Sequence, residues 1–249
     1  MEKKHAVISG GMGGVGQAVA KNLSAAGYSV SLLYNASSLS DVSIFLKSLS
    51  GTGHAGYACD LTNETLVRDL IQSIHQTVGH IDLLIHAATE PINRKSADQM
   101  NTKEFREQFE VSLFGGFSLI SSTIPIMREQ NAGHIIGILS SFIDDGFQTS
   151  RMHGYVASKF ALRGLLRSLA HELRGTSIRV NAVAPDLLQT NLSHDLPSRY
   201  FEWMAKSDPR GRITTPDDVA QSIQYLLSED DSLINGSILF VNPPHTKPL

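Results

Sequence analysis

The sequence has little of what several classes of protein require. Its only cysteine is Cys59, so no disulfide can form within the chain. The formal net charge is −3 and the lysines and arginines form no run, which argues against a nucleic acid partner. The amino terminus carries no signal-peptide core and no apolar run approaches membrane-spanning length, so we expect no membrane partner. These features predict a cytoplasmic protein.

The chain also lacks the spacings with which side chains bind metals. It holds 10 histidines, but His171-Glu172 has no second histidine four residues further on. Cys59 has no partner cysteine. We therefore expect no metal site.

What the chain does have is the alternation of an α/β protein. Its 249 residues show no break in composition, which predicts one domain spanning residues 1–249. Short β-rich runs alternate with longer segments of helical period, as in a parallel sheet covered by helices. The predicted strands are 5–9, 29–34, 55–59, 83–87, 134–139, 179–184 and 238–241. The predicted helices are 15–26, 40–49, 63–78, 102–128, 155–173 and 216–227.

This order of elements predicts a fold class. Connections between parallel strands are right-handed, so the chain should form a Rossmann-type, doubly wound parallel sheet of about seven strands with helices on both faces. Ligands then bind beyond the carboxyl ends of the strands.

A glycine-rich loop follows the first predicted strand. It reads Ser9-Gly10-Gly11-Met12-Gly13-Gly14-Val15-Gly16 and leads into a helix. Without side chains in the way, backbone N–H groups and the positive end of the helix can approach a pyrophosphate. The placement between first strand and first helix indicates a dinucleotide site; a tight turn without a ligand is the alternative.

The residues after the second strand bear on the choice of dinucleotide. An NAD site places Asp or Glu about 20 residues past the glycine loop, where it binds the ribose 2′-hydroxyl. This chain has Tyr34-Asn35-Ala36-Ser37-Ser38 there. No carboxylate would repel a 2′-phosphate, and Asn35 and Ser37 could donate hydrogen bonds to it. The pattern favours NADP(H) over NAD(H), although it lacks the arginine or lysine of a strong NADP site.

The most specific local pattern is Tyr155-Val156-Ala157-Ser158-Lys159. Residues four apart share one face of a helix, so the Lys159 ammonium can lie near the Tyr155 phenol and favour its ionised form. A phenol of ordinary pKa, near 10, is a poor acid–base group at neutral pH without such help. The pair Ser140-Ser141 lies upstream, at the end of a strand, and Asn181-Ala182-Val183-Ala184-Pro185 follows.

Taken in this order, the motifs resemble the short-chain dehydrogenase/reductase family over nearly the full chain, with a likeness to 3-oxoacyl-thioester reductases. The loop Ser9-Gly10-x3-Gly14-x-Gly16 is similar to the family's T-G-x3-G-x-G signature. The resemblance implies that Ser141 orients the substrate oxygen and that Tyr155 is the acid or base. It implies that Lys159 modulates the pKa of the tyrosine and binds the nicotinamide ribose. Ser140 is the less favoured serine, because the second of such a pair usually fills the role.

The resemblance also implies a set of cofactor-binding residues. Asp60 would contact the adenine edge, or could instead cap the helix that begins near Asn63. Leu188 would meet the carboxamide through its backbone and Thr190 through its hydroxyl. The complete predicted set is Gly10, Gly14, Val15, Gly16, Asn35, Ser37, Asp60, Leu61, Ala87, Tyr155, Lys159, Pro185, Leu188 and Thr190.

Several positions depart from the family pattern. His86-Ala87-Ala88-Thr89 stands where the family commonly has N-N-A-G, and His86 is either a structural substitute or a proton shuttle. Ser112 stands where an asparagine usually holds a water behind the lysine; it would hold that water less well or differently. Asp186 and Asn242-Pro243-Pro244 replace glycines near the rim of the site or the subunit contacts.

The resemblance further implies a substrate lid over residues 191–210. The aromatic residues there have near-helical spacing, which is also compatible with ordinary packing. Four basic residues could receive a carrier-bound acyl thioester or be solvated surface charges: Arg94, Lys95, Arg151 and Arg199. A leucine stripe could face the sheet or a partner subunit, and comprises Leu162, Leu165, Leu166, Leu169 and Leu173. By resemblance we expect a homotetramer or a dimer.

These observations predict an NADP(H)-dependent reductase that converts a carbonyl to a hydroxyl on a small-molecule substrate, with Tyr155 as proton donor. Two alternatives stay open. The same chemistry could run backwards in an NAD-dependent alcohol or sugar dehydrogenase. A dinucleotide-binding regulator with little catalysis would explain Ser112 and the altered His86 motif, but the presence of Ser141, Tyr155 and Lys159 argues against it.

Overall fold

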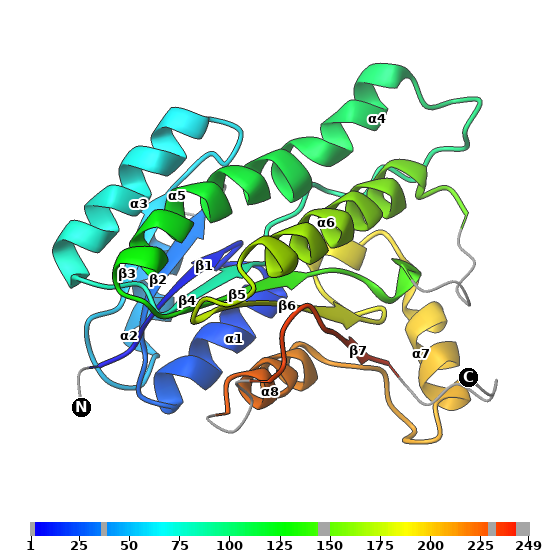
Figure 1. Ribbon diagram of the computed structural model, residues 1–249. Coiled ribbons are helices and arrows are strands. Elements are labelled where there is room, and N and C mark those ends of the chain that lie inside the picture. The colour runs from blue at the N-terminus through cyan, green and yellow to red at the C-terminus, as the bar shows by residue number, and fades with distance from the viewer. Residues whose placement is uncertain (1–2, 36–38, 144–149, 229–232, 243–249) are drawn as a thin grey trace.

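Seven parallel strands form a single sheet in the order β3-β2-β1-β4-β5-β6-β7 (Figure 1). The computed structural model describes residues 3–35, 39–143, 150–228 and 233–242. The strands are β1 His5–Ser9, β2 Ser29–Tyr34, β3 Ala55–Ala58, β4 Leu83–His86, β5 Gly133–Ile138, β6 Ile178–Pro185 and β7 Ile238–Val241. The predicted fold class, a doubly wound parallel sheet, is confirmed.

The central strands are buried on both faces, which is why they read as short, nearly continuous apolar runs. In β1, Ala6 lies opposite Val30 of β2 on one side and opposite Leu83 of β4 on the other. All five residues of β1 and all six of β2 are buried. The polar members of these strands pair with one another: the His5 ring is hydrogen-bonded to the hydroxyls of Ser29 and Ser31, at 2.8 and 3.0 Å.

Helices cover both faces of the sheet (Figure 1). They are α1 Gly14–Ala25, α2 Leu39–Lys47, α3 Glu64–Val78, α4 Thr102–Phe109, α5 Gly116–Glu129, α6 His153–Glu172, α7 Ser198–Ser207 and α8 Pro216–Leu226. One core joins α3, α5 and α6 to the sheet, and a second core on the other face joins α1, α2 and α8 to it. The leucine stripe of α6 lies in the first core, so it faces the sheet.

The segment predicted as one helix over residues 102–128 is divided. Between α4 and α5 lies a wider, π-helical turn, Glu110–Gly115. By length and composition alone, Thr102–Glu129 could cross a membrane, so our expectation that no segment approaches this length is wrong. In this fold Leu119, Ile120 and Met127 of the segment are fully buried in the core beneath the helix. Part of its apolar composition therefore serves the packing against the sheet, whereas Phe114 and Phe117 of the segment are exposed.

The helix α7 was not predicted from the sequence. It lies within the segment expected to be a lid, beyond the carboxyl ends of the strands (Figure 1). Phe201 is its one buried residue among the described side chains, whereas Trp203 is 61% exposed. The near-helical spacing of the aromatic residues in this segment is compatible with this helix, although Phe201 alone of its described side chains is buried.

Candidate active site

The glycine loop follows β1, the strand at which the order of strand addition in the sheet reverses. From β1 the chain goes on to β2 on one side, whereas β4 pairs with β1 on the other. Gly10 has a φ of +66°, and a Cβ there would lie 2.8 Å from the backbone nitrogen of Ala88, just after β4. A Cβ on Gly16 would overlap the carbonyl oxygen of Gly10. Glycine is therefore required at both positions for the loop to close against the end of β4.

The residues around this loop fit a dinucleotide. Gly13 is the N-cap of α1 and provides no side-chain cap, so the first amides of the helix keep their capacity to bind an anion. A Cβ on Gly14 would lie 2.7 Å from the Thr190 methyl group. The segment after β6 thus lies in contact with the start of α1, so both segments lie where a dinucleotide would bind.

The other described residues expected to bind the cofactor lie at or after the carboxyl ends of the strands or in the first turn of α1. Asn35 is exposed at the end of β2, and Ser37 lies outside the described residues. Leu188 is buried, and its carbonyl oxygen accepts a hydrogen bond from Ser193 at 2.6 Å. Ala87 follows β4, and its N–H donates to the Ser9 carbonyl oxygen at 3.2 Å. Val15 is the second residue of α1, and Pro185 ends β6.

Asp60 lies after β3, where it holds a turn. Its Oδ1 accepts hydrogen bonds from the backbone N–H and the hydroxyl of Thr62, at 3.0 and 2.8 Å. Asn63, not Asp60, caps α3 by accepting from the N–H of Leu66. Leu61 is buried where a Cβ on Gly115 would touch it, which links this turn to the π-helical segment.

Tyr155 and Lys159 lie on one face of α6. The Lys159 ammonium is 5.6 Å from the centre of the Tyr155 ring and donates to the Ile138 carbonyl oxygen at 2.9 Å. Burial lowers the pKa of Lys159 to about 8, although the negative charge of Glu90 acts to raise it. A group with that pKa is mostly charged at pH 7 and can still lose its proton at moderate cost.

The Tyr155 phenol is also buried, with 7% of the residue exposed. Burial raises the pKa of Tyr155, while a hydrogen bond with the Ser140 side chain and the positive charge of Arg94 act to lower it. Without a bound ligand the phenol is thus protonated at neutral pH. It is in the state that a proton donor needs.

The structure places Ser140, not Ser141, beside the phenol. Ser140 is the serine bonded to Tyr155. The Ser141 hydroxyl is fully buried and donates to Oδ1 of Asp186 at 3.2 Å. Ser140 follows β5 and Ser141 begins a short 3-10 helix, Ser141–Ile143, so the two hydroxyls have different partners. The resemblance to the family favoured Ser141 by its order in the pair and gave no information about these partners.

Glu90 is a site residue that the sequence analysis missed. Its carboxylate accepts hydrogen bonds from the backbone N–H of Val111 and from the N–H and hydroxyl of Ser112, the latter two at 3.3 and 2.8 Å. The Ser112 hydroxyl also lies 2.8 Å from that of Thr89. A carboxylate inserted into a helix takes N–H groups from its regular hydrogen bonds, which explains the π-helical turn at Glu110–Gly115.

His86 supports the same turn from the end of β4. Its Nε2 lies 2.9 Å from the Ser112 carbonyl oxygen, which can only accept, so Nε2 carries the proton. Its Nδ1 then accepts from the Ser9 hydroxyl at 2.8 Å. Burial, and next the charge of Lys159, lower the pKa of His86 to about 4. The ring is therefore a neutral bridge between β1 and the π-helical turn.

Arg94 connects this site to the segment expected to be a lid. Its Nε donates to Oδ2 of Asp195 at 2.6 Å, and its side chain is 21% exposed. Of the other basic residues considered for substrate entry, Lys95 pairs with Glu104, and Arg151 and Arg199 are exposed. Arg94 alone of the four lies against the site, through its effect on Tyr155.

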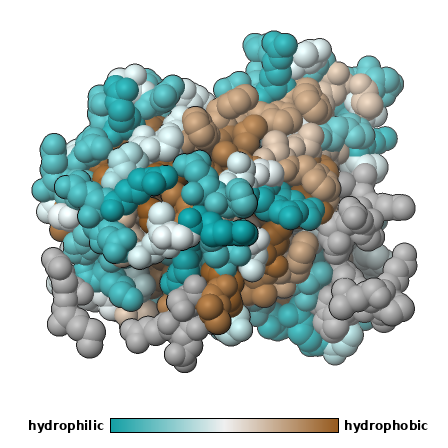
Figure 2. All heavy atoms as spheres, viewed as in Figure 1, coloured by the Kyte–Doolittle hydropathy of each residue, from teal (hydrophilic) through white to brown (hydrophobic). Residues whose placement is uncertain are grey.

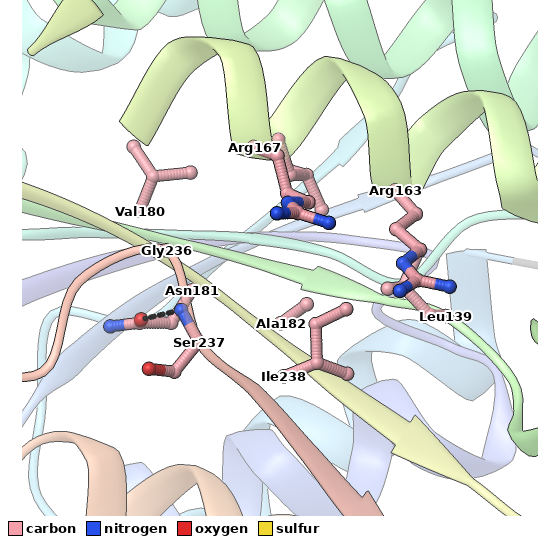
Figure 3. A pocket seen from close by; sticks show the side chains of 10 residues that line it. Leu139, Arg163, Arg167, Val180, Asn181, Ala182, Gly236, Ser237 and Ile238 are labelled. Carbon is pink, nitrogen blue, oxygen red and sulfur yellow. Dashed lines mark hydrogen bonds between the residues drawn. The ribbon is translucent and has the colours of Figure 1, made fainter. Parts of the chain in front are cut away.

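A separate small cavity lies under α6, against β6 and β7 (Figure 3). Its volume is about 10 Å³, room for about one water molecule. Arg163 and Arg167 of α6 point toward it, and the Ser237 N–H donates to the Asn181 side chain at its floor (Figure 3). It contains neither Tyr155 nor Lys159 and is no part of the candidate active site.

Comparisons with known proteins agree with this geometry. The sequence family described as enoyl-(acyl carrier protein) reductase matches residues 10–243. The chain is 32% identical over 244 residues to 3alpha-hydroxysteroid dehydrogenase of Mediterraneibacter gnavus, covering 97% of this chain and 96% of that protein. It is 31% identical over 243 residues to 3-oxoacyl-[acyl-carrier-protein] reductase of Bos taurus, covering 97% of each. The crystal structure of levodione reductase matches with a TM-score of 0.88, 25% identity and 96% coverage of each chain.

Proposed function

Because the chain belongs to the short-chain dehydrogenase/reductase family and is an oxidoreductase that binds a nicotinamide dinucleotide, we propose that it is an NADP(H)-dependent carbonyl reductase. Its proposed substrates are ketones, with 3-oxoacyl compounds foremost, as the name of the bovine relative suggests. The observation that carries the proposal is the buried cluster of Tyr155, Ser140 and Lys159 beside a glycine loop.

A bound NADPH would supply a hydride to the carbonyl carbon. The glycine loop would hold its pyrophosphate at the start of α1, and Leu188 and Thr190 would hold its nicotinamide end. The sequence has no Asp or Glu at positions 35–38, after β2, and this supports NADPH over NADH, because a carboxylate at those positions would repel a 2′-phosphate. The affinities for NADPH and NADH test this preference, and tighter binding of NADH would reject it.

Tyr155 gives its phenol proton to the carbonyl oxygen, which becomes the hydroxyl of the product. Ser140 donates a hydrogen bond to the same oxygen and orients it; we assign this role to Ser140 because Ser141 is bonded to Asp186. Lys159 stabilises the phenolate that remains, because its ammonium lies 5.6 Å from the centre of the tyrosine ring. The negative charge of Glu90, which accepts a hydrogen bond from the Ser112 hydroxyl, helps to keep Lys159 protonated.

The test is Tyr155→Phe, which removes the proton donor and keeps the ring. We expect kcat/KM with a ketone to fall roughly 10²- to 10⁴-fold, with the affinity for NADPH retained. Steady-state kinetics and a fluorescence titration of NADPH measure the two quantities. Turnover equal to that of the unchanged enzyme would reject the mechanism.

We also propose that the protein is a homo-oligomer, a tetramer or a dimer. Hydrophobic residues gather on the surface over α4, α5 and α6 (Figure 2). Among them Phe114, Phe117 and Phe160 are 54, 50 and 41% exposed. A second copy of the chain would cover these rings. Light scattering should show a multiple of the 27.1 kDa chain mass, and a monomer would contradict the proposal.

The proposed location is the cytoplasm, and the proposed lid over residues 191–210 includes α7. A cytoplasmic location suits the free thiol of Cys59, which is buried and stays reduced there. Cell fractionation tests the location. Proteolysis within α7 that slows when NADPH and a ketone are added together would support the lid.

A further inference from the structure

Arg94 is a partly buried cation whose hydrogen bonding is incomplete within the described part of the chain. It lies in the segment between β4 and α4, and 21% of its side chain is exposed. Its Nε donates to Asp195, and its Nη1 points to the sulfur of Met152 at 3.0 Å. Its Nη2 is buried and has no acceptor within the described part of the chain.

A guanidinium carries five N–H donors, and leaving buried donors of a charged group unpaired is unfavourable. Here the Asp195 carboxylate satisfies the Nε donor, and Met152 provides a weak acceptor at best. No group in the described ranges, 3–35, 39–143, 150–228 and 233–242, accepts from the two donors on Nη2. A ligand with an acceptor oxygen would satisfy them.

The unpaired donors lie close to the reacting centre. Met152 immediately precedes α6 and is buried three residues before Tyr155. Arg94 also lowers the pKa of the Tyr155 phenol by its charge, so the two groups are within electrostatic reach of each other. A substrate whose ketone oxygen meets Tyr155 can therefore place a second group of atoms against Arg94.

We infer that Arg94 is a specificity-determining residue that binds a second carbonyl oxygen of the substrate, so that the preferred substrates are 3-oxo esters or thioesters. The inference rests on the proposed function. In these compounds the second carbonyl lies two bonds along the chain from the ketone. A ketone whose remaining surface is hydrocarbon leaves Nη2 unpaired and binds less well.

Asp195 favours a neutral acceptor oxygen on the substrate over a negatively charged one. Its carboxylate lies 2.6 Å from Nε and already compensates the charge of the guanidinium. A free carboxylate on the substrate would meet the negative charge of Asp195, whereas a neutral ester or thioester oxygen would not. Because Asp195 lies in the predicted lid, between Asn191–Ser193 and α7, this pair also links the position of that segment to the new subsite.

The experiment compares two substrates of the NADPH-dependent enzyme. The first is the N-acetylcysteamine thioester of acetoacetate, and the second is 2-heptanone, which lacks the second carbonyl. We expect Arg94→Met to lower kcat/KM for the thioester roughly 10- to 100-fold, mainly through KM, and to change kcat/KM for the ketone less than about threefold. Arg94→Lys keeps the charge but not the planar guanidinium, so its kcat/KM for the thioester should lie between those of the unchanged enzyme and Arg94→Met.

Lys95→Met is the matched control, because Lys95 is the neighbouring cation, pairs with Glu104 and is 45% exposed. This variant should leave kcat/KM unchanged for both substrates. An equal loss on both substrates in Arg94→Met would overturn the inference, since Arg94 would then act only on Tyr155 or on folding. Unchanged NADPH affinity and unfolding temperature would show that the variant is folded.

A second measurement separates this inference from the proposed function. If the unchanged enzyme reduces neither compound, the proposed function fails, and binding of the 3-hydroxybutyryl thioester to the NADP⁺ complex decides the inference. Calorimetric binding that weakens about tenfold or more in Arg94→Met supports the subsite. No binding, or equal binding to both proteins, overturns it.

Discussion

Lys159 can assist Tyr155 only while it carries its proton. Burial removes water from the ammonium and lowers its pKa to about 8, close to neutral pH. Glu90 acts against this effect from the other side of the site. Of the other groups near the ammonium, His86 is neutral above its pKa of about 4, and Tyr155 is protonated. The carboxylate of Glu90 therefore sets how far toward alkaline pH the lysine stays charged.

We expect Glu90→Gln to make the reductase more sensitive to alkaline pH. In the unchanged enzyme, kcat/KM should decline as pH rises through about 8, where Lys159 loses its proton. The amide keeps an acceptor for Ser112 but removes the negative charge, so the pKa of Lys159 falls and the decline should begin roughly one pH unit lower. Rate profiles between pH 6 and 10 measure the shift. Glu110→Gln, an exposed acid in the same π-helical turn, is the control; coincident profiles for all three proteins would contradict the role of Glu90.

Among the elements, the glycine loop and the π-helical turn each owe their backbone conformation to contacts with residues from another part of the chain. The glycine loop is closed by contact with Ala88, which follows another strand. The π-helical turn is held by His86 and Glu90 from the segment around the end of β4. Both irregular elements therefore depend on the same segment after β4, which joins the cofactor side of the site to the catalytic side.

We expect Gly16→Ala to weaken NADPH binding. A methyl group there would overlap the Gly10 carbonyl oxygen and lie 2.8 Å from Gly11 Cα, so the loop must open and its amides lose their alignment. The dissociation constant for NADPH should rise roughly tenfold or more, as expected when positioned hydrogen bonds to a charged group are lost. A fluorescence titration measures it.

Gly164→Ala is the control for this substitution. A Cβ on Gly164 would meet nothing within 4 Å, and the position lies on α6, where alanine is favoured over glycine. We expect its NADPH affinity to be unchanged and its stability to rise slightly. Equal affinities in Gly16→Ala and Gly164→Ala would show that the loop does not hold the cofactor.

On the scale of the whole molecule, three neutral histidines are built into the sheet. His5, His86 and His134 lie in β1, β4 and β5 and are almost completely buried. Burial is the main cause that lowers the pKa of His5 and His86 to about 4 and that of His134 to about 3. In the unfolded chain each would take up a proton near pH 6.5.

This difference predicts a protein that loses stability in mild acid. Above pH 6.5 the histidines are neutral in both states and contribute no dependence on pH; below it only the unfolded chain gains protons, until the folded pKa values are reached. The free energy of unfolding should therefore fall by about 1.4 kcal/mol per pH unit for each histidine between about pH 6 and 4. Urea unfolding followed by circular dichroism at pH 7 and pH 5 measures the fall.

His134→Gln identifies the source of this acid sensitivity. Its amide oxygen can accept the hydrogen bond that Asn181 donates to the His134 ring at 2.9 Å, but it cannot take up a proton. In this variant the free energy of unfolding should fall less steeply as pH decreases, because one proton fewer is taken up on unfolding. A free energy of unfolding that is the same at pH 7 and pH 5 in the unchanged protein would contradict the prediction.

Sequence reasoning succeeded where the relevant physics is local. The bounds of β1, β2 and β7 agree with those predicted, because a buried parallel strand is a short apolar run between turns. It did not reveal the division of the helix over 102–128 or the hydrogen bond between Ser141 and Asp186. In both cases the deciding partner is distant in the chain: Glu90 lies 22 residues from Ser112, and Asp186 lies 45 residues from Ser141.

The sequence by itself determined the order of the strands and helices, the glycine loop and the four-residue spacing that sets a lysine beside a tyrosine, since helix geometry and steric limits act over a few residues. Only the tertiary structure decided which serine faces the phenol, which carboxylate supports the lysine and that Arg94 is turned inward. Those outcomes depend on contacts such as Arg94 with Asp195, 101 residues apart, and on how much water burial removes from each charge. The spacing of neighbouring residues encodes neither these long-range contacts nor the burial of each charge.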